Sequence, residues 1–256
     1  MNTDPSTAEA FMRLVHIMND LREKCPWDKK QTNETLRNLT IEETYELADA
    51  ILQNDPLMIK EEIGDIMLHL VFYARIAAEQ GQFSLAEAIN KVCDKLIHRH
   101  PHVYGDVILT DDTQVKQNWE MLKLKEGKKS VLGGVPAALP AMVKAYRMQE
   151  KTKQVGFEWD STDQVWAKVQ EELAELQEAI HDNHDQSHIE EEFGDVLFAL
   201  INYGRFIGVE AESALERINM KFKSRFEFIE ANAEKPLKEM SLDEMNALWD
   251  QAKKKK

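Results

Sequence analysis

The sequence has little of what marks a secreted, disulfide-stabilised protein. Its 256 residues include two cysteines, Cys25 and Cys93, and these do not form a CxxC pair. Without a disulfide framework, the expected compartment is a reducing cytoplasm. The first ten residues are polar and contain no basic segment followed by an apolar run, so no signal peptide is expected.

Long apolar runs and an excess of positive charge are also missing. The longest apolar stretch, residues 68–78, is interrupted by His69 and Arg75 and is too short to cross a bilayer. The formal net charge is −14. Because an acidic surface repels the phosphate backbone, broad binding of nucleic acid is not expected. The lack of a long apolar segment means that a membrane is not an expected partner either.

Glycine and proline are scarce, with 10 and 7 residues, and they gather in one segment. Residues 126–140 hold three glycines and two prolines, which is typical of a connector. The sequence therefore predicts an N-terminal domain at 1–125, a linker at 126–140 and a C-terminal domain at 141–256.

The same motifs recur in the same order on both sides of this linker. Counterparts lie 126 to 132 residues apart, which indicates an internal duplication. The matched pairs are Trp27-Asp28 with Trp159-Asp160, Glu42-Glu43-x-x-Glu46 with Glu171-Glu172-x-x-Glu175, Glu62-x-x-Asp65 with Glu192-x-x-Asp195, Lys95 and Arg99 with Lys221 and Arg225, and Trp119 and Lys123 with Trp249 and Lys253.

Each half has helical periodicity and no strand-like alternation, so the predicted fold class is all-α, with two tandem units of about four helices. Asp55-Pro56 predicts a helix start. Capping boxes are predicted where Thr40, Ser84, Ser187 and Ser241 are each followed three residues later by glutamate. Gly81 and Gly208 stand where helices are expected to end.

The paired acidic residues are the main candidates for chemistry. In the second half, Glu172 and Glu175 share one helical face, and Glu192 and Asp195 share a face of the next helix. Antiparallel packing of the two helices would gather these carboxylates. At about 4 Å two such charges repel by about 4 kcal/mol at an effective dielectric near 20, so a cation or a proton is needed between them. Oxygen ligands suit Mg²⁺, Mn²⁺ or Ca²⁺.

Two other interpretations of the acidic residues compete with a Mg²⁺ site. A single EExxE is most often a solvated helix face, but the added ExxD and the repetition of the whole set favour a metal site. A di-iron site needs two Glu-x-x-His pairs. The chain offers Glu178-x-x-His181 without a counterpart in the first half, which disfavours iron.

With these motifs in place, the chain closely resembles the MazG family of all-α nucleoside triphosphate pyrophosphohydrolases. The resemblance rests on the two EExxE and ExxD sets, on CPWD at 25–28, on HRHPHV at 98–103 and on KFxxRF at 221–226. It implies Mg²⁺-dependent hydrolysis of ribo- and deoxyribonucleoside triphosphates to monophosphate and pyrophosphate, with broad specificity, by a homodimer. Mn²⁺ is an expected substitute for Mg²⁺.

Carried over to this sequence, the resemblance implies that Glu172, Glu175, Glu192 and Asp195 bind the metal. Glu43, Glu46, Glu62 and Asp65 are a second set of the same kind. Glu171 and Glu191 are the candidates for accepting a proton from the attacking water.

Basic and aromatic residues of the second half are candidates for substrate binding. Lys221 and Arg225 lie one helical turn apart and can bind phosphate, as arginine does bidentately. Trp249 and Lys253 are also one turn apart, where an indole can stack on a base, although the tryptophan can equally anchor a terminal helix. Lys168, one turn before the acidic motif, is a further candidate.

The expected mechanism is metal-assisted attack of water on a phosphorus atom, and the resemblance, not the sequence alone, implies that this is the α-phosphorus. No Walker A loop is present, which disfavours a P-loop ATPase. The second repeat is the expected catalytic unit, because Pro101 ends the corresponding helix early in the first repeat. The first repeat is then regulatory, structural or weakly active. His98, His100 and His102 are expected to be structural or helix-capping, and His69 to be a satisfied core residue.

The resemblance is compatible with two roles, removal of damaged nucleotides and control of nucleotide pools. Two other functional classes stay open at this point. The protein could be a nucleotide- and metal-binding sensor or adaptor without turnover, or a purely structural helical dimer.

Overall fold

The computed structural model describes residues 5–108, 110–111, 114–115, 118–119, 122 and 130–254, which contain helices and turns but no strand. The predicted all-α class is confirmed. The chain divides into two compact units, Met1–Trp119 and Glu120–Lys256. None of the described helices is both long and apolar enough to cross a membrane.

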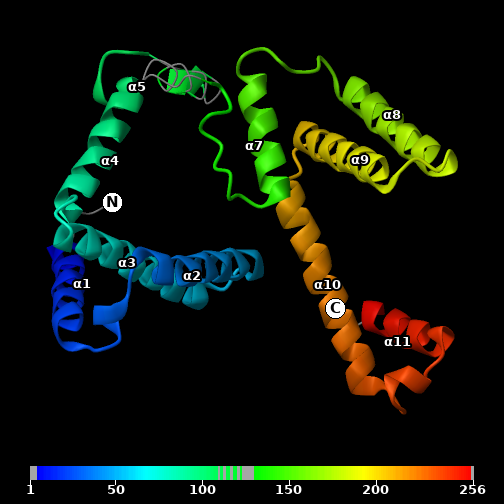
Figure 1. Cartoon of the computed structure of the whole chain (residues 1–256), viewed down its shortest axis with the longest axis horizontal. Helices are drawn as coiled ribbons and strands as arrows, with labels where there is room; N and C mark the ends of the chain where they lie inside the picture. The colour runs from blue at the N-terminus through cyan, green and yellow to red at the C-terminus, as the bar shows by residue number, and fades with distance from the viewer. Residues whose placement is uncertain are drawn as a thin grey trace. The chain divides into compact units, whose positions relative to one another are not determined.

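The first unit is built on a pair of long helices, α2 and α3, which pack side by side (Figure 1). Helix α1 packs on α3, and Met18, Leu36, Val71, Phe72 and Ile76 form the buried core. The elements are α1 (Pro5–Lys24), a 3₁₀ turn η1 (Asp28–Lys30), α2 (Asn33–Gln53), α3 (Pro56–Glu79), α4 (Leu85–Arg99) and α5 (Pro101–Tyr104).

The second unit repeats this plan with α8 and α9 as its long pair (Figure 1). Helix α7 packs on α9, and α11 packs on α10. The elements are α7 (Ala141–Lys153), α8 (Thr162–His181), α9 (Gln186–Phe206), α10 (Ala211–Asn232), a 3₁₀ turn η2 (Leu237–Glu239) and α11 (Leu242–Lys254).

Several predicted helix ends are confirmed. Asp55 caps α3 with Pro56 in the first turn, and Ser84 and Glu87 form a capping box. Ser241 and Glu244 bond each other's backbone amides in the same way. Gly81 and Gly208 have φ of 66° and 73°, a conformation that glycine adopts without the clash of a Cβ.

Two predicted capping boxes are wrong. Helix α2 begins at Asn33, where Thr32 and Thr35 form the box, so Thr40 lies inside the helix and its hydroxyl contacts Leu36 O and Tyr73 OH. Asp185 rather than Ser187 caps α9. In both cases a residue earlier in the chain caps the helix, because Asp and Thr are as suitable for the N-cap position as the predicted Thr or Ser.

The predicted linker begins among residues that lie outside the described part of the chain, as does Lys123, and residues 130–140 form turns. The boundaries 1–125 and 141–256 stay predictions.

The histidines divide into two cases. His100 caps the end of α4, and its Nδ1 lies 2.6 Å from Leu96 O, which agrees with a capping role. His69 is buried as expected, but its Nδ1 has no hydrogen-bond partner among the described residues. The prediction of a core histidine whose ring nitrogens are hydrogen-bonded is therefore wrong for Nδ1. Burial lowers the pKa of His69.

Candidate active site

The carboxylates of the second repeat gather between α8 and α9. Val165 and Val169 on α8, and Val196 and Ala199 on α9, are buried and fix the rotation of both helices. This rotation brings one carboxylate oxygen each of Glu172, Glu192 and Asp195 within 4.8 Å of one another. Three oxygen donors at this spacing, with Glu172 8% exposed, fit a hard divalent cation.

Glu175 lies outside this group of three but is electrostatically linked to it. Partial desolvation, followed by a hydrogen bond to Glu172 and the charge of Glu172, raises the pKa of Glu175. Glu171 and Glu191, the candidate proton acceptors, are exposed on α8 and α9. His188 approaches the cluster from α9, with its Nε2 3.7 Å from Glu192.

Lys168 lies on α8, one helical turn before the acidic motif of the second repeat. Its Nζ is 2.8 Å from an oxygen of Glu171 and 2.8 Å from an oxygen of Glu172. Hydrogen bonds to Glu171 and then Glu172 raise the pKa of Lys168, so the ammonium stays charged. The second repeat therefore has an internal counter-charge for its carboxylates.

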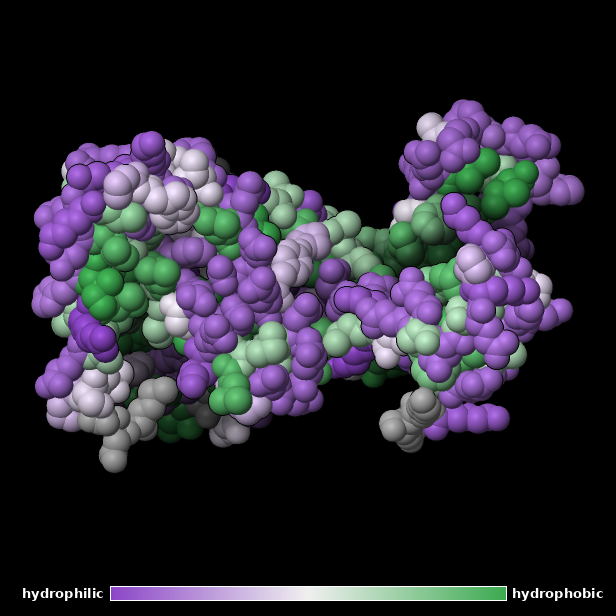
Figure 2. All heavy atoms as spheres, turned by 90° about the horizontal axis from the view of Figure 1, so that it is seen from below, coloured by the Kyte–Doolittle hydropathy of each residue, from purple (hydrophilic) through white to green (hydrophobic). Residues whose placement is uncertain are grey.

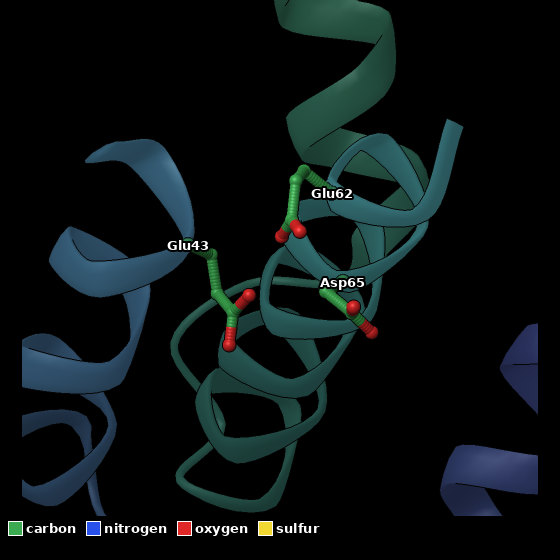
Figure 3. Close-up of side chains that lie close together, drawn as sticks. All are labelled: Glu43, Glu62 and Asp65. Carbon is green, nitrogen blue, oxygen red and sulfur yellow. The ribbon is translucent and has the colours of Figure 1, made fainter. Parts of the chain in front are cut away.

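The first repeat forms an equivalent cluster from Glu43, Glu62 and Asp65, whose ligand oxygens also lie within 4.8 Å of one another. Figure 3 shows the carboxyl groups of Glu43 and Glu62 turned toward each other between α2 and α3. Glu62 is 6% exposed, and its Oε2 is buried with no hydrogen-bond partner among the described residues. An orphaned buried carboxylate oxygen fits a cation ligand.

Burial and the neighbouring carboxylates together change the ionisation of this first cluster. Burial is the leading cause of the raised pKa values of Glu43, Glu46 and Glu62, and the neighbouring carboxylates add to it. The position equivalent to Lys168 is Leu39, which packs against the apolar core. The first cluster thus lacks the lysine that compensates the second.

A cavity of about 460 Å³ opens beside the second cluster. Lys168, Glu172 and Asp195 line one part of it. Apolar and aromatic side chains line another part, namely Leu132, Met148, Phe157, Trp159, Phe198 and Ala199. This cavity is not predicted by any motif of the sequence, where its one signal is the repeated Trp-Asp pair at 159–160.

The other predicted substrate residues form a separate cluster on α10 and α11. The guanidinium of Arg225 lies 5.3 Å from the centre of the Trp249 ring, and Phe222 packs on the same ring. Lys221 is exposed one turn before Arg225, and Lys253 pairs with Asp250 at 2.8 Å. None of the four predicted residues Lys221, Arg225, Trp249 and Lys253 lines the cavity.

The first repeat preserves this second arrangement. Arg99 lies 5.7 Å from the centre of the Trp119 ring, as Arg225 does over Trp249. The duplication therefore extends from the acidic motifs to a cation–π pair, although Pro101 starts a separate short helix directly after α4.

Comparison with known proteins defines the class of protein. The MazG nucleotide pyrophosphohydrolase domain matches residues 31–104 and again residues 161–228, so both matches contain an acidic cluster. The chain belongs to the MazG family and carries its domain twice.

The sequences of individual relatives match almost the whole of this chain. The chain is 44% identical over 251 residues to the nucleoside triphosphate pyrophosphohydrolase/pyrophosphatase MazG of Thermotoga maritima, covering 95% of each protein. It is 39% identical over 253 residues to the nucleoside triphosphate pyrophosphohydrolase of Escherichia coli K12, covering 94% of this chain and 96% of that one. It is 40% identical to YabN of Bacillus subtilis over 95% of this chain and 51% of YabN.

Proposed function

We propose that this chain hydrolyses nucleoside triphosphates, ribo- and deoxyribo-, to monophosphate and pyrophosphate, with Mg²⁺ bound in the second repeat. The observation that carries the proposal is the convergence of Glu172, Glu192 and Asp195 beside a cavity of ligand size. The names of the two full-length relatives support the same reaction.

The carboxylates Glu172, Glu175, Glu192 and Asp195 are the proposed ligands of Mg²⁺, and the same oxygen donors accept Mn²⁺. When bound, the ion neutralises phosphate charge and lowers the pKa of a water molecule. The chain's own residues supply the rest. Glu171 or Glu191 accepts the proton of the attacking water, and Lys168 places a fixed positive charge at the edge of the cavity.

Lys221 and Arg225 are proposed to bind the phosphates that leave as pyrophosphate. The guanidinium of Arg225 lies over the face of Trp249, which holds it from one side, and a planar guanidinium can bind phosphate bidentately. Lys253 on α11 is the third proposed cation, although Asp250 neutralises it in this structure.

A homodimer is the proposed assembly. Figure 2 shows hydrophobic residues at the surface among hydrophilic ones. Equivalent positions of the two repeats contribute to the exposed apolar surface, with Ile63, Met67 and Leu70 on α3 matching Phe193, Leu197 and Leu200 on α9. Exposed apolar stripes of this kind are typical of protein interfaces. We further propose a cytoplasmic location and a role in clearing damaged nucleotides or controlling nucleotide pools.

Product analysis tests the reaction. The protein is incubated with ATP and with dATP, with and without Mg²⁺, and the products are separated by ion-exchange chromatography. AMP or dAMP with pyrophosphate, formed only with the metal, is the expected result. ADP and phosphate would exclude attack on the α-phosphorus. Nucleotide binding without any turnover would instead support a sensor.

A further inference from the structure

The turn that joins α8 to α9 (Figure 1) is rich in histidine. Three of the eight histidines of the chain, His181, His184 and His188, fall within the segment HDNHDQSH at 181–188. The proposed reaction uses none of them. Short histidine-rich segments are typical of sites for transition-metal ions, because imidazole is a preferred ligand of Zn²⁺, Ni²⁺ and Cu²⁺.

Two of these histidines lie against each other. The ring centres of His184 and His188 are 4.6 Å apart, with 34° between the ring planes. The backbone of both is held by the turn, because the amide of His188 donates to Asp185 Oδ1 at 3.1 Å and the amide of His184 donates to Ala179 O at 3.0 Å. The ring of His184 is exposed, so it can turn a nitrogen toward an ion held by His188.

A carboxylate also lies near His188. The Nε2 atom of His188 is 3.7 Å from Oε1 of Glu192, one turn further along α9. This is too long for a direct hydrogen bond, whose usual N···O distance is about 2.7–3.2 Å. It is close to the separation of about 3.4 Å between two ligand atoms of a tetrahedral Zn²⁺ with metal–ligand bonds of about 2.0–2.2 Å. The two side chains are therefore spaced for an ion between them.

The first repeat has the carboxylates of the cluster without the histidine. Asp55 and Asp185 cap the corresponding helices α3 and α9. Three residues after the cap stands Met58 in the first repeat and His188 in the second. The comparison shows that the helix and its acidic cluster form without an imidazole at this position.

The turn of the second repeat is also longer by one residue. In the first repeat Asn54, which is left-handed with φ of 55°, directly precedes the capping aspartate. In the second repeat the left-handed residue is Asn183, with φ of 54°, and His184 stands between it and the capping aspartate. These two differences place a pair of imidazoles beside the second cluster and none at the equivalent positions of the first.

We propose that His184, His188 and Glu192 form a binding site for a transition-metal ion of the Zn²⁺ class. Two imidazoles and one carboxylate, with water in the fourth position, are a ligand set that suits Zn²⁺, whereas Mg²⁺ prefers oxygen ligands alone. The site shares one member with the carboxylate cluster, since an oxygen of Glu192 lies within 4.8 Å of oxygens of Glu172 and Asp195.

Sharing of Glu192 has a consequence for the reaction. An ion held by the two histidines draws Glu192 away from the Mg²⁺ that it is proposed to bind, so Zn²⁺ should inhibit the enzyme. This consequence rests on the proposed function, whereas the binding of Zn²⁺ by the histidines does not.

Calorimetric titration of the full chain with Zn²⁺, in excess Mg²⁺, tests the site. His184→Ala and His188→Ala should each weaken binding of Zn²⁺ by at least about tenfold, since even the loss of a residue that only orients a metal ligand costs about 10–100-fold in affinity. His181→Ala is the matched control, because this histidine is exposed in the same segment and is not a proposed ligand. It should leave the Kd unchanged. No binding of Zn²⁺ to wild type, or equal losses in His181→Ala and His188→Ala, would overturn the proposal.

Release of pyrophosphate from ATP in excess Mg²⁺ tests the sharing of Glu192. Zn²⁺ should inhibit wild type and His181→Ala at the same concentration, and the concentration for half inhibition should rise at least about tenfold in His188→Ala. Each protein is compared with its own rate without Zn²⁺. Zn²⁺ that binds through the histidines but leaves the rate unchanged would show that Glu192 is not a ligand and would overturn the shared site.

The two measurements separate this proposal from the proposed function. Binding of Zn²⁺ that is lost in His188→Ala, in a protein that releases no pyrophosphate, would leave the ion site standing and refute the reaction. Release of pyrophosphate in Mg²⁺ without any binding of Zn²⁺ would refute the ion site alone.

Discussion

Leu39 stands in the first repeat where the second repeat has Lys168. This single difference leaves Glu43, Glu62 and Asp65 without the ammonium that compensates Glu171 and Glu172. Two carboxylate clusters of similar geometry therefore differ in their need for a cation. At the residue scale, the consequences appear in stability for the first cluster and in catalysis for the second.

Glu62→Gln should stabilise the first unit at neutral pH when EDTA removes divalent ions. The folded-state pKa values of Glu43, Glu46 and Glu62 are raised. Their contribution to stability is therefore present below the pKa of an unfolded glutamate and is lost as pH rises through the folded pKa. The variant escapes this loss, so its melting temperature should exceed that of wild type by roughly 2–4 °C at pH 7.5 and match it at pH 4.

Thermal melts followed by circular dichroism measure this difference. Glu9→Gln, an exposed carboxylate of α1, is the control and should not change the melting temperature at either pH. A lower melting temperature of Glu62→Gln at pH 7.5 would mean that the ionised Glu62 stabilises the fold.

Lys168→Met should lower kcat/KM for ATP by at least about tenfold, because charge-assisted hydrogen bonds are each worth about 1.5–3 kcal/mol. The ammonium lies 2.8 Å from Glu171 and Glu172 and lines the cavity. Lys168→Arg keeps the charge and should retain part of the activity. The measurement is steady-state release of pyrophosphate. Unchanged kinetics in Lys168→Met would show that the lysine takes no part in the reaction.

At the scale of elements, the turn between α7 and α8 depends on one buried ion pair. Arg205 is 4% exposed in its side chain, and Glu158 accepts two hydrogen bonds from it at 2.8 and 2.6 Å. Asn202 Oδ1 also accepts from Arg205 at 2.8 Å, and Glu150 lies 3.5 Å away. Glu158→Ala should lower the free energy of unfolding by about 3 kcal/mol, because the buried guanidinium loses its nearest carboxylate.

Urea unfolding measures this change. Asp20→Ala breaks an exposed pair with Lys24 and should leave the free energy of unfolding nearly unchanged. If the two variants were equally stable, Arg205 would have found other partners and the turn would not depend on Glu158.

The elements also show how far the sequence could predict the molecule. Helical periodicity, Asp55-Pro56 and the Ser84 box predicted helices correctly, because these signals act within one or two turns. The predicted capping box at Thr40 was wrong, because an earlier threonine, Thr32, caps α2 and forms the box with Thr35. The helical spacing of the acidic residues predicted that Glu172, Glu192 and Asp195 lie close together, and the packing of α8 on α9 brings them together.

The cavity was beyond prediction for a physical reason. Gln149, Phe157 and Phe198 come from three segments, and only packing of α7 on α9 brings them together. The unpaired Gln149 Oε1 is a property of that packing, since nothing in the sequence distinguishes this glutamine from an exposed one.

At the scale of the whole molecule, the exposed stripes of α3 and α9 lead to a prediction about assembly. Wild type should be a dimer in size-exclusion chromatography with light scattering. Leu197→Asp should shift it toward monomer, because a carboxylate would be buried in an apolar interface. Gln177→Asp, at an exposed polar position of α8, is the control and should remain dimeric. A monomeric wild type would contradict the proposed homodimer.

The central claim is that catalysis belongs to the carboxylates of the second repeat. The most direct measurement compares Glu172→Gln with Glu43→Gln, its counterpart in the first repeat, by pyrophosphate release from ATP in Mg²⁺. The account predicts a loss of at least about 100-fold in kcat for Glu172→Gln, of the size seen when a group that acts in the transition state is removed, and a change within twofold for Glu43→Gln. Activity retained in Glu172→Gln and lost in Glu43→Gln would place the reaction in the first repeat and contradict the account.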